Sequence, residues 1–228
     1  MEFIERKLYT YKVIAGMIAR EVADISCRVI GITGTSSVGK STFSRTLRKK
    51  ITNLGYHIQV ISADNYLKPE FRAGHHFWNR KDSAYLKPEH FDWEAIRLDL
   101  EKLKNSQSVT KECYVRGTGW GPIQTVEPSQ IYIIEGLFLD SVLTSKSLDF
   151  DLLISLTAKD GFIRSLRIRR DAYYRRISET FTRTEEETLR EIENTLRAAK
   201  SYTPCSSWRY HLVLRVQKAF HATIERES

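Results

Sequence analysis

The sequence predicts an α/β fold in which a parallel sheet of about five strands is covered by helices on both faces. Two observations lead to this prediction. Short apolar, β-branched runs alternate with longer segments of helical spacing along most of the chain. The first of these runs also leads directly into GTSSVGKS (34–41), a Gly-x-x-x-x-Gly-Lys-Ser loop of the kind that joins a buried strand to a helix.

Bulk properties narrow the class of protein. The 228 residues fit one large domain, and 36 Lys and Arg against 28 Asp and Glu give a net charge of +8. Such an excess suits an anionic substrate or nucleic acid. We favour a small anionic substrate and expect no nucleic-acid partner, because no nucleic-acid-binding motif is visible. The three cysteines are widely spaced and no apolar run is long enough to span a bilayer, so we expect a cytoplasmic protein with no membrane partner.

The first 64 residues yield four elements. Apolar residues recur at helical spacing over 3–25, which predicts an amphipathic helix packed on the sheet, although a membrane-surface or dimer role is an alternative. RVIGIT (28–33) is the first strand, and the helix after the glycine loop runs from Lys40 to Leu54, where Gly55 ends it. HIQVISAD (57–64) is the second strand.

The rest of the chain is richer in helix. We expect a helix over 91–105, strands over 130–136, 149–156 and 209–214, helices over about 160–177 and after Thr184, and a closing helix at VQKAFHATIER (216–226). Thr184 and Glu187 form a Thr-x-x-Glu capping box. We therefore predict an N-terminal helix within 1–26 that packs on a single domain of residues 27–228, with a helical lid around 160–185.

The glycine loop predicts a nucleotide site and hence the three-layer P-loop NTPase fold. Gly34 and Gly39 let the backbone curl so that its N–H groups face phosphate oxygens. Lys40 can reach the β- and γ-phosphates, and the hydroxyl of Ser41 can bind Mg²⁺. The predicted ligands are ATP and Mg²⁺, and the residues expected to hold the nucleotide are Gly34, Thr35, Ser36, Ser37, Val38, Gly39, Lys40, Ser41 and Thr42.

Asp64 separates a kinase from the other classes of P-loop protein. The chain lacks the guanine-reading Asn-Lys-x-Asp of GTPase switches, and motor-type ATPases are usually larger. A small-molecule kinase needs a carboxylate at the end of a neighbouring strand to accept the proton of the attacking hydroxyl. Asp64, at the end of HIQVISAD, is placed for this role.

Several segments resemble the uridine kinase and phosphoribulokinase group, which includes nicotinamide riboside and pantothenate kinases. ISADNYLKP (61–69) is similar to its Ser-x-Asp-x-Phe/Tyr segment, and IIEGLFL (133–139) to its Ile-x-Glu-Gly segment. The resemblance implies that Asp64 is the catalytic base and a candidate metal ligand, that Tyr66 lines the acceptor site, and that Glu135 acts on Mg²⁺. KPEHFDWEAI (87–96) is similar to a segment in which Asp92 would cap a helix and Phe91 would pack.

An arginine-rich segment supports the same group. RSLRIRRDAYYRR (164–176) resembles the lid helix of the family, which implies catalytic roles for Arg167 and Arg170 and a nucleotide contact for Arg175. Arg164, Arg167 and Arg170 also share one helix face, from which guanidinium groups can neutralise a transferred phosphoryl group. The alternative is a solvated basic face.

The resemblance departs from the family at the acceptor site. Tyr85 and Leu86 stand where uridine kinases have Phe-Asp, and Tyr114 is followed by Val115 where the family has an acid. The predicted acceptor residues are Tyr66, Tyr85, Tyr114 and Arg116, and GHHFWNR (74–80) is a candidate acceptor loop. Uridine or cytidine is the first choice of acceptor, ahead of nicotinamide riboside, pantothenate or another alcohol. The alternatives are a non-catalytic regulatory nucleotide-binding protein and, less favoured, a nucleic-acid-binding protein; a homo-oligomer would agree with the resemblance.

Overall fold

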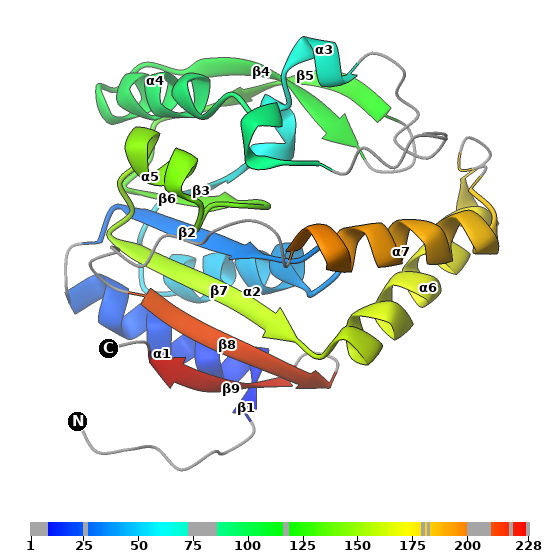
Figure 1. Cartoon of the computed structure of the whole chain (residues 1–228). Coiled ribbons are helices and arrows are strands. Elements are labelled where there is room, and N and C mark those ends of the chain that lie inside the picture. Colours follow the sequence, from blue (N-terminus) through cyan, green and yellow to red (C-terminus); the bar gives the residue numbers. More distant parts are fainter. Residues whose placement is uncertain are drawn as a thin grey trace.

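The computed structural model describes residues 9–24, 27–72, 86–115, 119–178, 181, 183–199, 211–218 and 221–226. Figure 1 shows a central sheet with helices on both faces and a helical pair that projects beyond one end of the strands. The strands are β1 (Tyr9–Thr10), β2 (Val29–Gly34), β3 (Ile58–Ser62), β4 (Val109–Val115), β5 (Gly119–Val126), β6 (Ile131–Glu135), β7 (Leu152–Ala158), β8 (His211–Lys218) and β9 (His221–Arg226). The α-helices are α1 (Tyr11–Asp24), α2 (Lys40–Thr52), α3 (Pro69–Arg72), α4 (Trp93–Lys104), α5 (Val142–Ser147), α6 (Asp160–Ile177) and α7 (Glu185–Ala199), and short 3-10 turns cover Ala63–Tyr66 and Pro88–His90.

The main sheet has the order β1-β9-β8-β7-β2-β6-β3 within the described residues. The five strands β3, β6, β2, β7 and β8 are parallel to one another, whereas β9 and β1 run antiparallel at one edge. The central strands β2, β6 and β7 are buried on both faces along most of their length, which explains their nearly continuous apolar sequences. The predicted α/β fold, with about five parallel strands between layers of helices, is confirmed.

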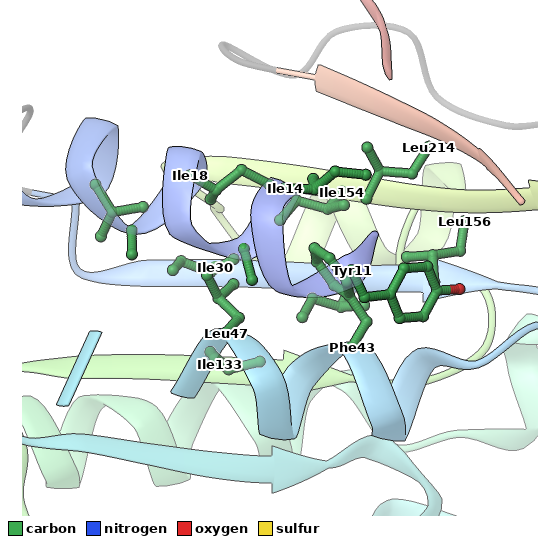
Figure 2. Close-up of a cluster of buried hydrophobic side chains, with 14 of the residues drawn as sticks. Tyr11, Ile14, Ile18, Ile30, Phe43, Leu47, Ile133, Ile154, Leu156 and Leu214 are labelled. Carbon is green, nitrogen blue, oxygen red and sulfur yellow. The ribbon is translucent and has the colours of Figure 1, made fainter. Parts of the chain in front are cut away.

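Helices α1 and α2 cover one face of this sheet. Ile14, Ile18 and Val22 recur every four residues, so they form one stripe along α1, and all three are buried. They pack in one core with Phe43 and Leu47 of α2 (Figure 2) and with apolar residues of the parallel strands. Helix α1 is therefore part of the same core as the strand that leads into the phosphate loop.

Helices α4 and α5 cover the opposite face. Along β6, Ile133 belongs to the core under α1 and α2, whereas Ile134 belongs to the core under α4, as the alternation of side chains along a strand requires. Helix α4 begins where the Asp92 carboxylate accepts a hydrogen bond from the Ala95 N–H at 2.9 Å. Phe91 beside it is buried in this second core. The predicted helix cap at Asp92 and the packing of Phe91 are both confirmed.

The two ends of the described chain differ from the sequence prediction. The helix expected over 3–25 begins only at Tyr11, because Tyr9 and Thr10 pair with β9; residues 3–8 lie outside the described residues. The closing helix expected at VQKAFHATIER is wrong: this segment contains the end of β8 and all of β9, which form an antiparallel pair. The apolar residues of this short segment fit both the helical and the strand period. The strand is favoured because its backbone pairs with the edge of β8.

The helical pair α6 and α7 agrees with the prediction. The Thr184 hydroxyl accepts a hydrogen bond from the Glu187 N–H at 3.2 Å, and the Glu187 carboxylate accepts one from the Thr184 N–H at 2.8 Å. This is the predicted capping box. In the part of the chain that the structure describes, the helices are too short or too polar to cross a membrane.

Candidate active site

The candidate site lies where β2, β3 and β6 end. Ile32 of β2 and Ser62 of β3 are both register partners of Glu135 in β6, so these three residues form one row across the sheet. Gly34 and Asp64 each follow this row by two residues. Because β2 and β3 are separated by one strand, Ile32 and Ser62 are about 10 Å apart across the sheet. A phosphate chain that starts at the glycine loop would extend across this interval.

The phosphate loop has a backbone that only glycine can adopt easily at two positions. Gly34 has a φ of 135°, and a Cβ there would lie 2.2 Å from the carbonyl oxygen of Leu156. Gly39 has a φ of 106°, and a Cβ there would lie 3.0 Å from the hydroxyl of Tyr11. Ser37, which is not a glycine, also has a positive φ of 71°. The neighbouring strand and α1 therefore fix the path of this loop.

Two hydroxyl groups of the loop fit a phosphate ligand. Thr35 Oγ1 and Ser37 Oγ are buried and find no hydrogen-bond partner among the described residues. Buried polar groups usually have a partner, so a ligand rich in acceptor oxygens would complete this loop. Ser36 is half-buried, Val38 packs inward, and the Thr42 N–H donates to the Gly39 carbonyl at 3.1 Å as α2 begins.

Lys40 lies over the loop. Its Nζ donates to the carbonyl oxygens of Gly34 at 2.8 Å and of Thr35 at 3.0 Å. Both acceptors are neutral, and Lys40 is the first residue of α2, where the helix dipole favours an anion. The ammonium group is thus held at the position from which it can transfer its hydrogen bonds to phosphate oxygens.

Ser41 and Glu135 meet between the loop and β6. The Ser41 hydroxyl is 3.0 Å from one carboxylate oxygen of Glu135 and 3.2 Å from the other. The described residues contain no group of three or more His, Cys, Asp and Glu that could hold a metal by themselves. A hydroxyl beside a single carboxylate fits Mg²⁺, which usually takes one or two protein ligands and completes its shell with phosphate oxygens and water.

Asp64 lies in the 3-10 turn that follows β3, where it is half-buried. A Cβ at Gly136 would lie 2.5 Å from the Cβ of Ala63, so the lack of a side chain at Gly136 lets this turn approach β6. On the other side, the Asn65 amide oxygen accepts a hydrogen bond from the Tyr114 N–H at 2.8 Å. The turn that carries Asp64 is therefore held between β6 and the hairpin β4–β5.

The predicted acceptor residues have different surroundings. Tyr66 is buried, its hydroxyl donates to Asp99 of α4 at 3.0 Å, and Lys111 lies over its ring. Burial, together with the charge of Asp99, raises the pKa of Tyr66. Tyr114 is half-buried, with its ring 5.6 Å from that of Trp120 on β5. Tyr85, Arg116 and the loop GHHFWNR lie outside the described residues.

Two arginines of the predicted lid, Arg167 and Arg170, are paired with carboxylates of α6 and α7, and Arg175 is bound to other polar groups. Arg167 is only 3% exposed; its guanidinium contacts Glu191 and lies 4.0 Å from Asp171. Arg170 is 20% exposed, and its Nε donates a hydrogen bond to the Asp171 carboxylate at 3.0 Å. Arg175 donates to the Arg183 carbonyl at 3.2 Å and to the Thr188 hydroxyl at 3.3 Å. The structure thus places these arginines in the joint between the two helices.

Sequence reasoning missed the other members of this joint. Asp171 is fully buried, and Arg183 contacts it at 3.3 Å and also contacts Glu191. Burial by itself would raise the pKa of Asp171, but Arg170, Arg167 and Arg183 outweigh burial and hold its pKa below the ordinary value. The Arg-Asp pair in the sequence was the available signal, but the partners on α7 become visible only in the folded chain. We refer to Arg167, Arg170, Asp171, Arg183 and Glu191 as the lid ion cluster.

Comparisons with known proteins agree with this geometry. The family model described as Phosphoribulokinase / Uridine kinase family matches residues 29–205. A uridine kinase from Leuconostoc citreum is 30% identical over 147 residues, which are 63% of this chain and 68% of that protein. A uridine kinase from Haemophilus influenzae is 31% identical over 151 residues, which are 64% and 69% of the two chains. The matches thus span about two thirds of these relatives.

Solved structures support the fold. A putative fructose transport system kinase from Silicibacter sp. TM1040 has a TM-score of 0.62 at 20% identity, over 86% of this chain and 97% of that one. D-glycerate 3-kinase from Cryptococcus neoformans has a TM-score of 0.69 at 12% identity, over 95% and 99%. At these identities the likeness concerns the fold alone.

The family resemblance predicted from the phosphate loop, the Asp64 segment and the Glu135 segment is therefore confirmed. So is the prediction of a phosphotransferase that uses ATP and acts on a hydroxyl group. The chain belongs to the phosphoribulokinase/uridine kinase family.

Proposed function

We propose that this protein is an ATP-dependent nucleoside kinase that transfers the γ-phosphate to a primary hydroxyl group of uridine or cytidine. The observation that carries the proposal is the row formed by Ile32, Glu135 and Ser62, which aligns the phosphate loop and the Asp64 turn at one sheet edge. The uridine kinases among its relatives support the choice of a nucleoside.

The phosphate loop would hold the triphosphate of ATP. Its N–H groups and the first turn of α2 face the phosphates, and Lys40 exchanges its two carbonyl acceptors for β- and γ-phosphate oxygens. Ser41 and Glu135 would hold Mg²⁺, which neutralises charge on the β- and γ-phosphates when it is bound. Asp64 is a further candidate ligand for this ion.

Asp64 would act as the general base. Its carboxylate accepts the proton of the acceptor hydroxyl as that oxygen forms a bond to the γ-phosphorus. The bond between the γ-phosphorus and the bridging oxygen breaks at the same time, and ADP leaves with that electron pair. Because Gly136 and Asn65 hold the turn from two sides, the carboxylate needs little rearrangement to reach its working position.

The α6–α7 pair would close over the phosphates as a lid. We propose that Arg170, the more exposed arginine of the lid ion cluster, reaches the transferred phosphoryl group, while Arg167 orients it and Arg175 contacts the nucleotide. Closure would exclude water and so limit hydrolysis of ATP.

A second candidate acceptor class is favoured by two positions. Leu86 and Val115 stand where the uridine kinases have acids, so hydroxyl-binding carboxylates expected for a ribose are absent at these two positions. These two positions therefore favour pantothenate or a sugar-like alcohol as the acceptor. Nicotinamide riboside, which also carries a ribose, is an alternative that rests on the family resemblance alone. A regulatory protein that binds ATP without transfer is the alternative from another class, and the cytoplasmic location and a homo-oligomer remain predictions.

One assay separates these functions. The protein is incubated with labelled ATP, Mg²⁺ and a panel of nucleosides, vitamins and sugars, and labelled products are resolved by chromatography. Transfer to uridine or cytidine supports the nucleoside kinase, and transfer to another alcohol supports the second class. Binding of ATP without any product would contradict a kinase and favour the regulatory protein.

The Asp64→Asn variant tests the assigned base. We expect turnover to fall by about two to four orders of magnitude, with ATP affinity nearly unchanged, because the amide keeps the shape and loses the basic oxygen. Glu70→Gln is the matched control, since Glu70 is an exposed acid on α3. Turnover of Asp64→Asn equal to that of Glu70→Gln would show that Asp64 is not the base.

A further inference from the structure

Helix α1 brings a side chain to the phosphate loop from outside the family match, which covers residues 29–205. Tyr11 is the first residue of this helix and is 4% exposed. Its hydroxyl donates a hydrogen bond to the Val38 carbonyl at 3.2 Å. Its ring packs edge-on against that of Phe43 in α2, with the ring centroids 5.2 Å apart (Figure 2). The Tyr11 hydroxyl therefore contacts the loop two residues before Lys40.

Two local features fix the position of Tyr11. Thr10, the residue before it, pairs with His221 of β9, and the Thr10 hydroxyl accepts a hydrogen bond from the Val13 N–H at 3.3 Å, as in a helix N-cap. Tyr11 also begins the buried stripe of α1, so its ring lies in the same core as the side chain of Val38. The backbone before Tyr11 and the packing around its ring thus leave the hydroxyl little freedom to move.

The hydrogen bond from Tyr11 sets the direction of one peptide group in the loop. The described peptide bonds are trans, so the Gly39 N–H points opposite to the Val38 carbonyl within the plane that they share. With this carbonyl held toward α1, the Gly39 N–H is directed to the other side of the loop. Phosphate loops bind the α- and β-phosphates of a nucleotide through backbone N–H groups of this kind.

This part of the loop needs a restraint from outside. Ser37 and Gly39, on either side of Val38, both have a positive φ, of 71° and 106°. Such a backbone is strained at a serine and persists only where the surrounding structure holds it. Turning the peptide would break the hydrogen bond of the buried Tyr11 hydroxyl, which is costly. Burial also raises the pKa of Tyr11, so the hydroxyl keeps its proton and remains a donor.

We infer that Tyr11 is a positioning residue for the phosphate site: it holds the Val38 carbonyl toward α1 and thereby keeps the Gly39 N–H in place to donate to the β-phosphate of ATP. The inference rests on the proposed role of the loop as the triphosphate site and is independent of the acceptor. ADP carries the same β-phosphate, so Tyr11 should matter equally for both nucleotides. Since α1 and β9 place Tyr11, two segments outside the family match determine how well the loop holds its nucleotide.

The Tyr11→Phe variant tests this role, because it removes the hydroxyl and keeps the ring in the core. Calorimetry in the presence of Mg²⁺ gives the affinity for ADP and for a non-hydrolysable ATP analogue. Both affinities should be about tenfold weaker than in the parent, as expected when a hydrogen bond to a charged group loses its fixed orientation. Unchanged affinity for both nucleotides in Tyr11→Phe would overturn the inference.

Tyr132→Phe is the matched control. Tyr132 of β6 is 1% exposed and lies in the core on the opposite face of the sheet, where its hydroxyl accepts a hydrogen bond from the Ser129 N–H at 2.7 Å. Both variants lose one bond between a buried hydroxyl and the backbone, so urea unfolding should show similar losses of stability. Nucleotide affinity should fall only in Tyr11→Phe. Equal weakening in the two variants would mean a general loss of stability and would overturn the inference.

Hydrogen exchange at the Gly39 amide reports on the N–H itself. In isotope-labelled parent protein saturated with Mg²⁺ and ADP, this amide should exchange more slowly than in the free protein. In saturated Tyr11→Phe its exchange should be about tenfold faster than in the parent complex, and in saturated Tyr132→Phe it should match the parent. Equal protection in all three complexes would overturn the inference. A parent that binds neither nucleotide would refute the proposed role of the loop, and the inference with it, so the parent titration separates that failure from a failure of Tyr11 alone.

Discussion

The phosphate loop and the α6–α7 pair, the predicted lid, both carry cations expected near a phosphate, but the structure holds these cations in different ways. Lys40 bonds to two backbone carbonyls, which are neutral. Arg167 and Arg170 bond to carboxylates, and one of these, Asp171, is completely buried. A lysine on neutral acceptors can change partner at small cost, whereas an arginine paired with a buried carboxylate cannot.

This difference separates residues that bind a ligand from residues that join α6 to α7. The lid ion cluster carries three positive and two negative charges, and it joins α6 to α7 through Arg183 and Glu191. We expect the two helices to move as one body. If so, changes in the phosphate loop should affect ligand binding with little loss of stability, and changes in the cluster should affect stability first.

The largest effect is expected for Asp171→Asn. Three guanidinium groups would lose their buried partner, and removing one member of a buried ion pair costs about 3–5 kcal/mol. Urea unfolding monitored by circular dichroism gives the free energy of unfolding. Glu193→Gln is the control from the same pair of helices, since the ion pair of Glu193 with Arg164 is exposed. This exposed pair should contribute less than about 1 kcal/mol to the free energy of unfolding. Similar losses in both variants would refute the special role of the buried cluster.

The same cluster predicts a pH dependence. Because the pKa of Asp171 is lowered in the folded state, its stabilising contribution is fully present above the unfolded pKa, about 3.9. The contribution is lost as the pH falls through the lower folded pKa. The parent should therefore lose its stability advantage over Asp171→Asn in this acidic range. An advantage that is constant down to the lowest pH measured would contradict the lowered pKa.

The next effect is expected for Lys40→Ala. ATP affinity and turnover should fall together, with turnover reduced by about two to three orders of magnitude, as for the loss of one preorganised electrostatic contact to the transition state. The free energy of unfolding should stay close to that of the parent, because the hydrogen bonds that Lys40 donates to Gly34 and Thr35 have neutral backbone carbonyls as acceptors. Lys104→Ala on α4 is an exposed control. Normal ATP affinity in Lys40→Ala would remove Lys40 from the phosphate site.

The smallest effect is expected for Thr184→Ala, which removes one half of the capping box of α7. The Glu187 N–H loses its acceptor, at a cost of about 0.5–2 kcal/mol. Arg190→Ala breaks an exposed pair on the same helix and should cost no more than about 0.5 kcal/mol. Comparable stability of the two variants would mean that α7 is held by the lid ion cluster and not by its cap.

Much of the fold could be predicted because its signals are local. The strand at 28–33, the glycine loop and the helix after it follow one another within about 25 residues, and each has its own pattern. Local signals have a limit at the end of the chain, where they predicted a closing helix and the structure has β9. The residues of β9 have no strong period of their own, and their state depends on β8, which offers an unpaired edge.

The candidate site was partly predictable for the same reason. Glu135 and Asp64 each follow an apolar strand, and parallel strands bring such residues to one edge of the sheet. The partners of the lid arginines were not predictable, because Glu191 meets Arg167 only after α7 folds back along α6. The engagement of Tyr66 with Asp99 was missed for a similar reason, since it depends on how α4 packs.

The participation of α1 and β8 in the core has a consequence for anyone who shortens this protein. The family match ends at residue 205 and begins at residue 29, yet Ile14 of α1 and Leu214 of β8 lie in the core that supports the phosphate loop. A version trimmed to the matching segment would leave β7 as a bare edge and would uncover the part of one sheet face on which α1 packs. Such a fragment should aggregate during expression, and its failure would say nothing about the catalytic residues it still contains.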